Sequence, residues 1–277
     1  MRHQTVLEYK RYRYLKLAIL VVTVSIVAYA VYTSPVGRYG GTPMGYTLGT
    51  VGALLILWLM WFGIRKRRYR GSSGNIQGWL SGHVYLGTAL IVVATLHTGF
   101  QVGWNVHTLA YVLMLLVIFS GFYGLYAYLR VPQLMTENLG EDTLDSIILK
   151  IADIDREARR LAVGMPDNIN RAIQDSLQGT RIGGGVLAQL SGRAGNCPTA
   201  KAVTTIQAAV RQFTGDEARA NKELYALMLR KQNLVERARL DIHYKAILDF
   251  WLYLHVPLSL ALLAALTAHV ISVFFYW

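Results

Sequence analysis

Two stretches decide the fold of this chain: GHVYLGTALIVVATLHTG at residues 82–99 and LHVPLSLALLAALTAHVI at residues 254–271. Neither contains Asp, Glu, Lys or Arg, and each carries two histidines at the same spacing: His83 and His97 in the first stretch, His255 and His269 in the second. A helix turns about 100° per residue, so at this spacing both rings of a pair project from nearly one face. They lie about 21 Å apart along the axis, most of the roughly 30 Å hydrocarbon core of a bilayer.

The rest of the chain has the composition of a membrane protein. Of its 277 residues, 53% are hydrophobic and 16% are charged, and its mean hydropathy is +0.32. A membrane-spanning helix needs about 20 mostly apolar residues. The sequence predicts an all-α membrane protein with five such helices, at residues 15–35, 46–64, 79–101, 107–129 and 248–276.

The distribution of charge predicts the orientation of these spans. The chain carries a net charge of +12, yet residues 131–246 contain 16 basic and 14 acidic side chains and contribute only +2. Most of the remaining basic residues flank the first two spans: Arg2, Lys10, Arg11, Arg13, Lys16, Arg65, Lys66, Arg67, Arg68 and Arg70. By the positive-inside rule the N-terminus is cytoplasmic and the C-terminus periplasmic. We expect this charge to contact anionic membrane lipid, and we expect no nucleic acid as a partner.

These patterns divide the chain into three parts. Residues 1–130 hold a basic cytoplasmic N-terminus and spans one to four. We expect the first apolar run to be retained as a span and not cleaved as a signal peptide. Residues 131–246 form a soluble, helical cytoplasmic segment, and residues 247–277 form the fifth span. The single cysteine, Cys197, excludes a disulfide framework or a Cys-ligated iron–sulfur cluster within this chain.

The soluble segment has the pattern of amphipathic helices. Thr143 is expected to cap a helix with apolar residues at helical spacing from Leu144 to Leu161. Further helices are expected from Pro166 to about residue 177, over 200–213, and from about residue 216 directly into the fifth span. A glycine run at 183–185 lacks the context of a nucleotide-binding loop and predicts an ordinary loop. We interpret the segment as a docking platform.

The four histidines form two matched pairs. The separation in sequence between His83 and His255 equals the separation between His97 and His269. Spans three and five run in the same direction across the membrane, so His83 should face His255 near the inner side and His97 should face His269 near the outer side. Simple packing is the alternative for any one intramembrane histidine.

Two other histidines, His107 and His243, lie at span ends without partners at matching spacing. Each is a possible rival ligand or quinone-pocket residue, but we expect interfacial roles. Small residues at Gly82, Gly87, Gly121 and Gly124 would admit either a flat macrocycle or a neighbouring helix.

The chemistry of these pairs favours iron in a porphyrin. A separation of about 21 Å along one helix forbids one shared zinc or copper ion, and the stretches at residues 82–99 and 254–271 hold no carboxylate for a proton relay. We therefore expect two haem b groups, with iron bound by His83 and His255 and by His97 and His269. Two axial histidines leave no open position on the iron and favour outer-sphere electron transfer.

With these residues the chain resembles the superfamily of di-haem b-type cytochromes, which includes the cytochrome b of respiratory complexes and the ferric-reductase-like transmembrane domain. The resemblance covers the membrane part, residues 1–130 and 247–277, and rests on His83, His97, His255 and His269. It implies that they are axial haem ligands. The flavin and nicotinamide domains of ferric reductases are missing, and the soluble segment lies between spans four and five instead of after the last span.

The sequence thus predicts an electron-transfer subunit of a multi-subunit redox complex in a bacterial-type cytoplasmic membrane. Expected partners are an iron–sulfur or flavin protein inside, a cytochrome c or similar protein outside, and quinone. One alternative is an outer-face reductase of ferric ion or oxygen with a separate donor subunit. Another is a non-redox membrane scaffold in which the histidines only pack.

Overall fold

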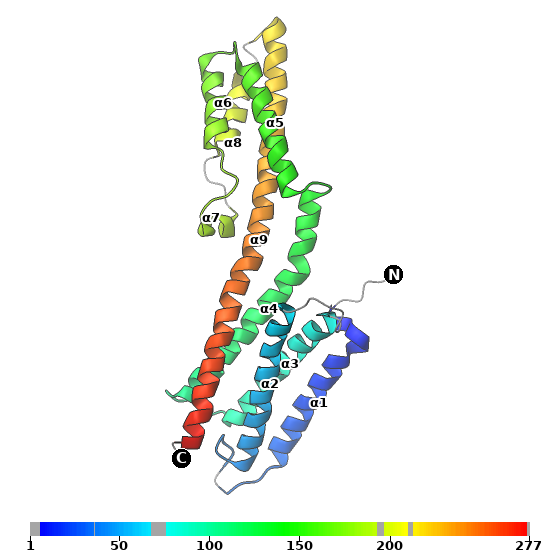
Figure 1. Ribbon diagram of the computed structural model, residues 1–277, viewed down its shortest axis with the longest axis vertical. Helices are drawn as coiled ribbons and strands as arrows, with labels where there is room; N and C mark the ends of the chain where they lie inside the picture. The colour runs from blue at the N-terminus through cyan, green and yellow to red at the C-terminus, as the bar shows by residue number, and fades with distance from the viewer. Residues whose placement is uncertain (1–5, 36, 68–75, 193–196, 210–212, 276–277) are drawn as a thin grey trace. The chain divides into compact units, whose positions relative to one another are not determined.

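The structure is a computed structural model that describes residues 6–35, 37–67, 76–192, 197–209 and 213–275 (Figure 1). These residues form helices joined by short loops, and none of them lies in a β-strand. The predicted all-α class is therefore confirmed. A short 3₁₀ turn, Val6–Glu8, precedes the first helix.

Five helices within the described residues are long and apolar enough to cross a membrane. They are α1 (Tyr9–Val31), α2 (Pro43–Arg67), α3 (Ile76–Thr98), α4 (Val106–Leu139) and α9 (Gly215–Phe275). Each overlaps one predicted span, so the prediction of five spanning helices is confirmed. α4 continues through Pro132, about three turns beyond its predicted span, and α9 is one continuous helix, as expected.

The chain divides into two compact units. The first, here called the membrane unit, comprises Met1–Tyr126 and Trp251–Trp277, and the second, here called the helical unit, comprises Ala127–Phe250. Both boundaries fall inside long helices, so α4 and α9 each contribute to both units.

The membrane unit is held together by an apolar core shared among its helices. α1, α2 and α3 lie side by side (Figure 1). The largest buried cluster draws on all five helices: Ala18, Ile56, Leu59, Leu86, Ala89, Leu90, Met114 and Leu262. Large apolar side chains on the same helices point outward, with Leu20 58% exposed, Leu54 61% and Phe119 57%. An apolar exterior over helices of this length is what a lipid environment requires.

Glycines let aromatic side chains approach the α3 backbone. A Cβ at Gly82 would lie 2.9 Å from the indole of Trp58 and 3.1 Å from the ring of Tyr14, and one at Gly78 would lie 2.7 Å from the ring of Tyr9. These glycines therefore admit neighbouring helices. Of the two alternatives stated for Gly82, helix packing is the one that the structure bears out.

The helical unit adds α5 (Leu144–Ala162), α6 (Asp167–Gly179), α7 (Val186–Ser191) and α8 (Pro198–Ala209) to parts of α4 and α9. The predicted cap is confirmed, since the Thr143 hydroxyl accepts from the Ser146 backbone N–H and the Ser146 hydroxyl accepts from the Thr143 N–H. Only α7 was not expected, because so short a helix is too brief for a periodic pattern.

A buried lysine links three helices of this unit. Lys231 on α9 is 1% exposed, and its Nζ lies 2.6 Å from Asp155 Oδ1 on α5. Its ammonium also donates to the backbone carbonyl and the hydroxyl of Ser176 on α6. Burying an ammonium without such partners would be costly, so these contacts fix how α5, α6 and α9 pack.

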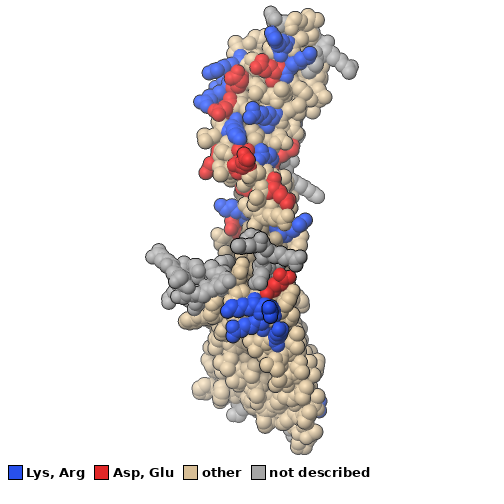
Figure 2. Space-filling view, turned by 90° about the vertical axis from the view of Figure 1, so that its right-hand side faces the viewer, with Lys and Arg blue, Asp and Glu red and all other residues tan. Residues whose placement is uncertain are grey.

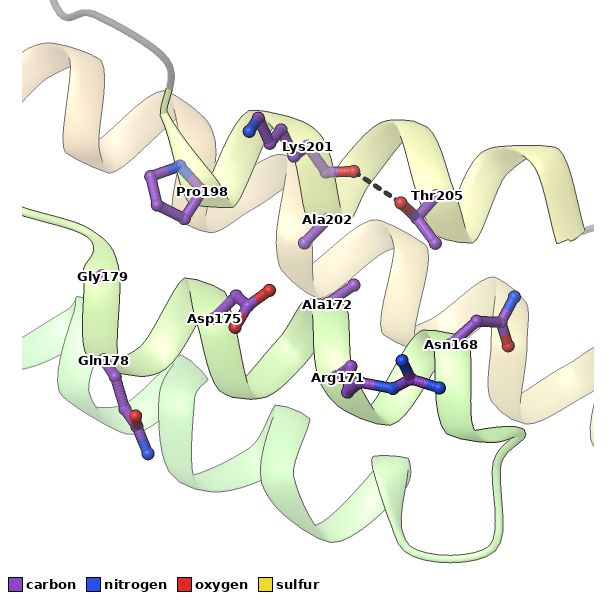
Figure 3. A pocket seen from close by; sticks show the side chains of 10 residues that line it. All are labelled: Asn168, Arg171, Ala172, Asp175, Gln178, Gly179, Pro198, Lys201, Ala202 and Thr205. Carbon is purple, nitrogen blue, oxygen red and sulfur yellow. Dashed lines mark hydrogen bonds between the residues drawn. The ribbon is translucent and has the colours of Figure 1, made fainter.

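An open pocket of about 770 Å³ lies between α6 and α8 of the helical unit (Figure 3). Its lining mixes the cations Arg171 and Lys201 with the carboxylate of Asp175 and with amide and hydroxyl side chains. The lining contains no histidine or cysteine, so it offers no imidazole or thiolate ligand.

The charged side chains are spread differently over the two units (Figure 2). On the helical unit, blue and red side chains alternate, as expected for a segment with nearly balanced charge. On the membrane unit, most of the visible surface is uncharged and basic side chains gather at one end. Lys10, Arg11, Arg13 and Lys16 belong to the described part of the predicted basic flank. Arg2, Arg68 and Arg70 lie outside the described residues, as do the side chains of residues 65–67.

Candidate functional site

The structure brings the four spanning histidines together in two facing pairs. α3 carries His83 and His97, and α9 carries His255 and His269. The ring centroids of His83 and His255 are 6.5 Å apart, and those of His97 and His269 are 5.9 Å apart. The partners are those expected for parallel helices. Whether the four side chains bind a cofactor stays a prediction.

These separations suit two imidazoles on opposite sides of one metal ion. A metal–imidazole bond is about 2.0–2.1 Å and the ring centre lies about 1.1 Å behind the nitrogen, so the two centres would be about 6.3 Å apart. The observed 6.5 Å and 5.9 Å fall on either side of this value. No group of three or more metal-ligating side chains occurs among the described residues, so the geometry fits two-ligand axial binding and not a protein-only metal site.

Hydrogen bonds fix the tautomer of two of these rings. His97 Nδ1 lies 2.8 Å from the carbonyl oxygen of Gly45, which can only accept. His255 Nδ1 lies 2.7 Å from the Ser120 hydroxyl, whose own hydrogen is donated to the Val117 carbonyl. Both Nδ1 atoms must therefore carry the proton. The Nε2 lone pairs remain available to a metal ion, in the arrangement common for metal-bound histidines.

His83 differs from these two rings. Its Nδ1 is buried and has no hydrogen-bond partner within the described part of the chain. A buried polar atom without a partner costs about 1–3 kcal/mol. No acceptor at Nδ1 among the described residues therefore fixes the tautomer of His83, in contrast to His97 and His255. The donor set of four imidazoles thus fits two iron porphyrins.

Glycines shape the space around His97. A Cβ at Gly49 on α2 would lie 2.7 Å from His97 Cε1, and one at Gly40 would lie 3.4 Å from the same atom. Gly40, Gly49 and the carbonyl of Gly45 form a cradle around the His97 ring. Any larger residue at position 49 would disrupt this cradle. This cradle was not predicted from the sequence, although the spacing of Gly45 and Gly49 by one helical turn was a visible signal.

α4 and α9 position the ring of His255. The Trp251 indole donates from Nε1 to the Ser120 carbonyl at 2.8 Å, and a Cβ at Gly124 would lie only 2.0 Å from that indole. A Cβ at Gly121 would lie 3.5 Å from His255 Cε1. Gly124 therefore receives an aromatic side chain, while Gly121 leaves room beside the histidine ring.

An apolar layer separates the two pairs. Leu90 lies midway in sequence between His83 and His97, and Leu262 lies midway between His255 and His269. Both leucines are buried in one cluster with Met114 of α4. These three side chains form an apolar layer midway along the helices between the pairs.

The structure assigns different surroundings to the two remaining candidate histidines. His107 lies against His269, with ring centroids 4.5 Å apart and the two Nδ1 atoms hydrogen-bonded. The sequence predicted only an interfacial role for His107 and did not predict this direct contact with His269. His243 belongs to the helical unit, where its Nδ1 bonds to the carbonyl of Gln189 at 2.8 Å.

Cys197 directly precedes α8 (Pro198–Ala209). Burial raises the pKa of its thiol, but hydrogen bonds from backbone N–H groups of α8 and from Arg239 outweigh burial and bring the pKa below its ordinary value.

Comparison with known proteins identifies no relative: the chain matches no family model, no curated protein and no solved structure. The function must therefore be argued from the residues.

Proposed function

We propose that this chain is a di-haem b-type cytochrome subunit that carries electrons across a membrane. The observation that carries the proposal is the pair of facing imidazoles on α3 and α9, repeated at the same spacing further along both helices. His83 and His255 would hold one haem and His97 and His269 the other. The likeness to di-haem cytochromes and ferric-reductase-like membrane domains is part of this proposal.

The chemistry that each haem supplies is one-electron oxidation and reduction of its iron. The two imidazoles of each pair would bind the iron and would leave no position on it for substrate, which would limit each haem to outer-sphere transfer. The Gly45 carbonyl and the Ser120 hydroxyl accept hydrogen bonds from Nδ1 of His97 and His255 and thereby orient the two rings. Leu90, Leu262 and Met114 would form an apolar layer between the two positions.

We propose further that the chain serves a respiratory complex in a bacterial-type cytoplasmic membrane, with the N-terminus cytoplasmic and the C-terminus periplasmic. Electrons would pass between an iron–sulfur or flavin subunit inside and a cytochrome c or similar protein outside, with quinone as a possible donor or acceptor. The charge distribution supports this orientation. The helical unit, with its open pocket between α6 and α8, offers a surface on which a cytoplasmic subunit could dock.

Purification from haem-replete cells tests the proposal. We expect two haem b groups per chain by pyridine haemochrome assay, a reduced b-type absorption spectrum and low-spin ferric signals in electron paramagnetic resonance. Steep angles between the paired rings, 66° and 81°, predict strongly anisotropic signals.

Single replacements then test the assignment. His83→Ala or His255→Ala should remove one haem, and His97→Ala or His269→Ala the other. His243→Ala is the matched control, because His243 bonds to Gln189 outside the membrane unit, and it should retain both haems. A folded, haem-free wild-type protein would reject the electron-transfer function and favour a membrane scaffold.

A further inference from the structure

His107 occupies a fixed place beside one of the predicted ligands. It lies in the first turn of α4, and the Asn105 side chain caps this turn by accepting from the Thr108 N–H at 3.0 Å. The cap holds the start of the helix. From this position the His107 ring meets the His269 ring at 90°, with centroids 4.5 Å apart and a hydrogen bond between the two Nδ1 atoms.

This contact is not a metal site of its own. Two imidazoles that share a metal ion have centres about 6.3 Å apart, so 4.5 Å is too short. The two rings instead share one proton, which must sit on one of the Nδ1 atoms. If His107 donates, the neutral His269 ring carries its proton on Nε2 and cannot bind a metal through that atom. If His269 donates, its Nε2 lone pair is free.

The other histidines show which of these two arrangements matches the rest of the site. His97 and His255 both donate from Nδ1, to the Gly45 carbonyl and to the Ser120 hydroxyl respectively. His107 stands in the corresponding place for His269. Around a metal site, such an acceptor commonly fixes the ring and raises the basicity of the ligand.

We infer that His107 is a positioning residue: it accepts a hydrogen bond from Nδ1 of His269 and so leaves Nε2 of His269 free to bind iron opposite His97. This inference rests on the proposed di-haem function. It makes the two sites chemically distinct: His255 is held by a hydroxyl, which is a weak acceptor, and His269 by an imidazole nitrogen, which is a stronger one. A more basic axial ligand stabilises ferric iron and lowers the reduction potential of its haem.

Redox titration of purified, haem-loaded variants tests the inference. His107→Leu removes the acceptor and should raise the midpoint potential of one haem, with the ferrous to ferric ratio at fixed potential increasing about tenfold, or about 59 mV for one electron. His107→Gln retains an amide oxygen that can accept, and should restore most of the wild-type potential. Ser120→Ala is the matched variant, which should change the potential of the other haem alone.

Each alternative has its own outcome. Unchanged potentials and spectra in His107→Leu, with both haems bound, would overturn the positioning role and leave the proposed function standing. Retention of both low-spin haems in His269→Ala, with one high-spin haem in His107→Leu, would also overturn it, because His107 would then be the axial ligand itself. Wild-type protein without haem would overturn the proposed function and this inference together.

Discussion

Replacement of Gly49 by alanine should disturb only the pair formed by His97 and His269. The new Cβ would lie 2.7 Å from His97 Cε1 and 3.0 Å from Nδ1, whereas ordinary contact begins at 3.4 Å. The His97 ring must therefore retreat by about 0.7 Å, the difference between 3.4 Å and 2.7 Å. Position 49 lies on α2 and offers no flexible atom that could give way instead.

This retreat also weakens the bond that orients the ring. The Gly45 carbonyl lies one turn earlier on the same helix, so a ring that withdraws from position 49 also withdraws from that oxygen. The Nδ1–O distance of 2.8 Å would increase to about 3.5 Å, beyond the roughly 3.2 Å limit of a good N–H···O bond. Loss of such a supporting contact to a ligand typically costs about 10–100-fold in metal affinity, or about 1.4–2.7 kcal/mol.

The assay is the haem-to-protein ratio during titration with a haem-binding competitor. In Gly49→Ala we expect one haem to be lost at about 10–100-fold lower competitor concentration than in the wild type. Gly52→Ala is the matched control, one turn further along α2, because its Cβ would make ordinary contacts alone, at 3.7 Å from Leu90 Cδ1 and 4.0 Å from Val93 Cγ1. If Gly49→Ala is folded and keeps both haems with wild-type affinity, the cradle does not control the His97 ring.

Three further predictions concern the helical unit. Lys231→Met leaves Asp155 without its cation and should lower the free energy of unfolding by about 2–3 kcal/mol, less than for a fully buried pair because Asp155 is 23% exposed; unchanged denaturant curves would contradict this. Thr143→Ala removes the cap of α5 and should cost about 1 kcal/mol, with Thr143→Ser as the control that retains stability. The hydrogen bond from Lys150 holds the pKa of Asp142 below its ordinary value, so this contribution to stability is present above about pH 4 and is lost as the pH falls through the folded-state pKa. Asp142→Asn should therefore reduce the acid sensitivity of unfolding, and an unchanged pH profile would argue against the contact.

The sequence predicted the features that depend on repetition along one helix. Charge-free stretches long enough to cross a bilayer located the spans, and a spacing common to two helices paired His83 with His255 and His97 with His269. The predicted span at 107–129 did not reveal the full length of α4, because composition marks where apolar sequence ends, whereas the helix continues through Pro132 to Leu139.

Contacts between helices were harder to predict. His107 and His269 lie far apart in the chain, and nothing in either segment encodes their lateral approach. The cradle around His97 has the same character, because a glycine in an apolar helix is equally compatible with contact to lipid, to another helix or to a ring. Such contacts depend on how each helix is rotated about its axis and on the angles at which helices cross. The pattern of a single sequence determines neither of these.

The apolar layer between the two histidine pairs has a consequence for energy conversion. An electron that crosses from one proposed haem to the other travels about 21 Å along the helix axes, past this apolar layer. This is about 70% of the hydrocarbon thickness, so each transfer would do electrical work of about 1.6 kcal/mol per 100 mV of membrane potential. The direction and rate of transfer would then respond to the membrane voltage itself, and the chain would contribute to charging or discharging the membrane with every turnover.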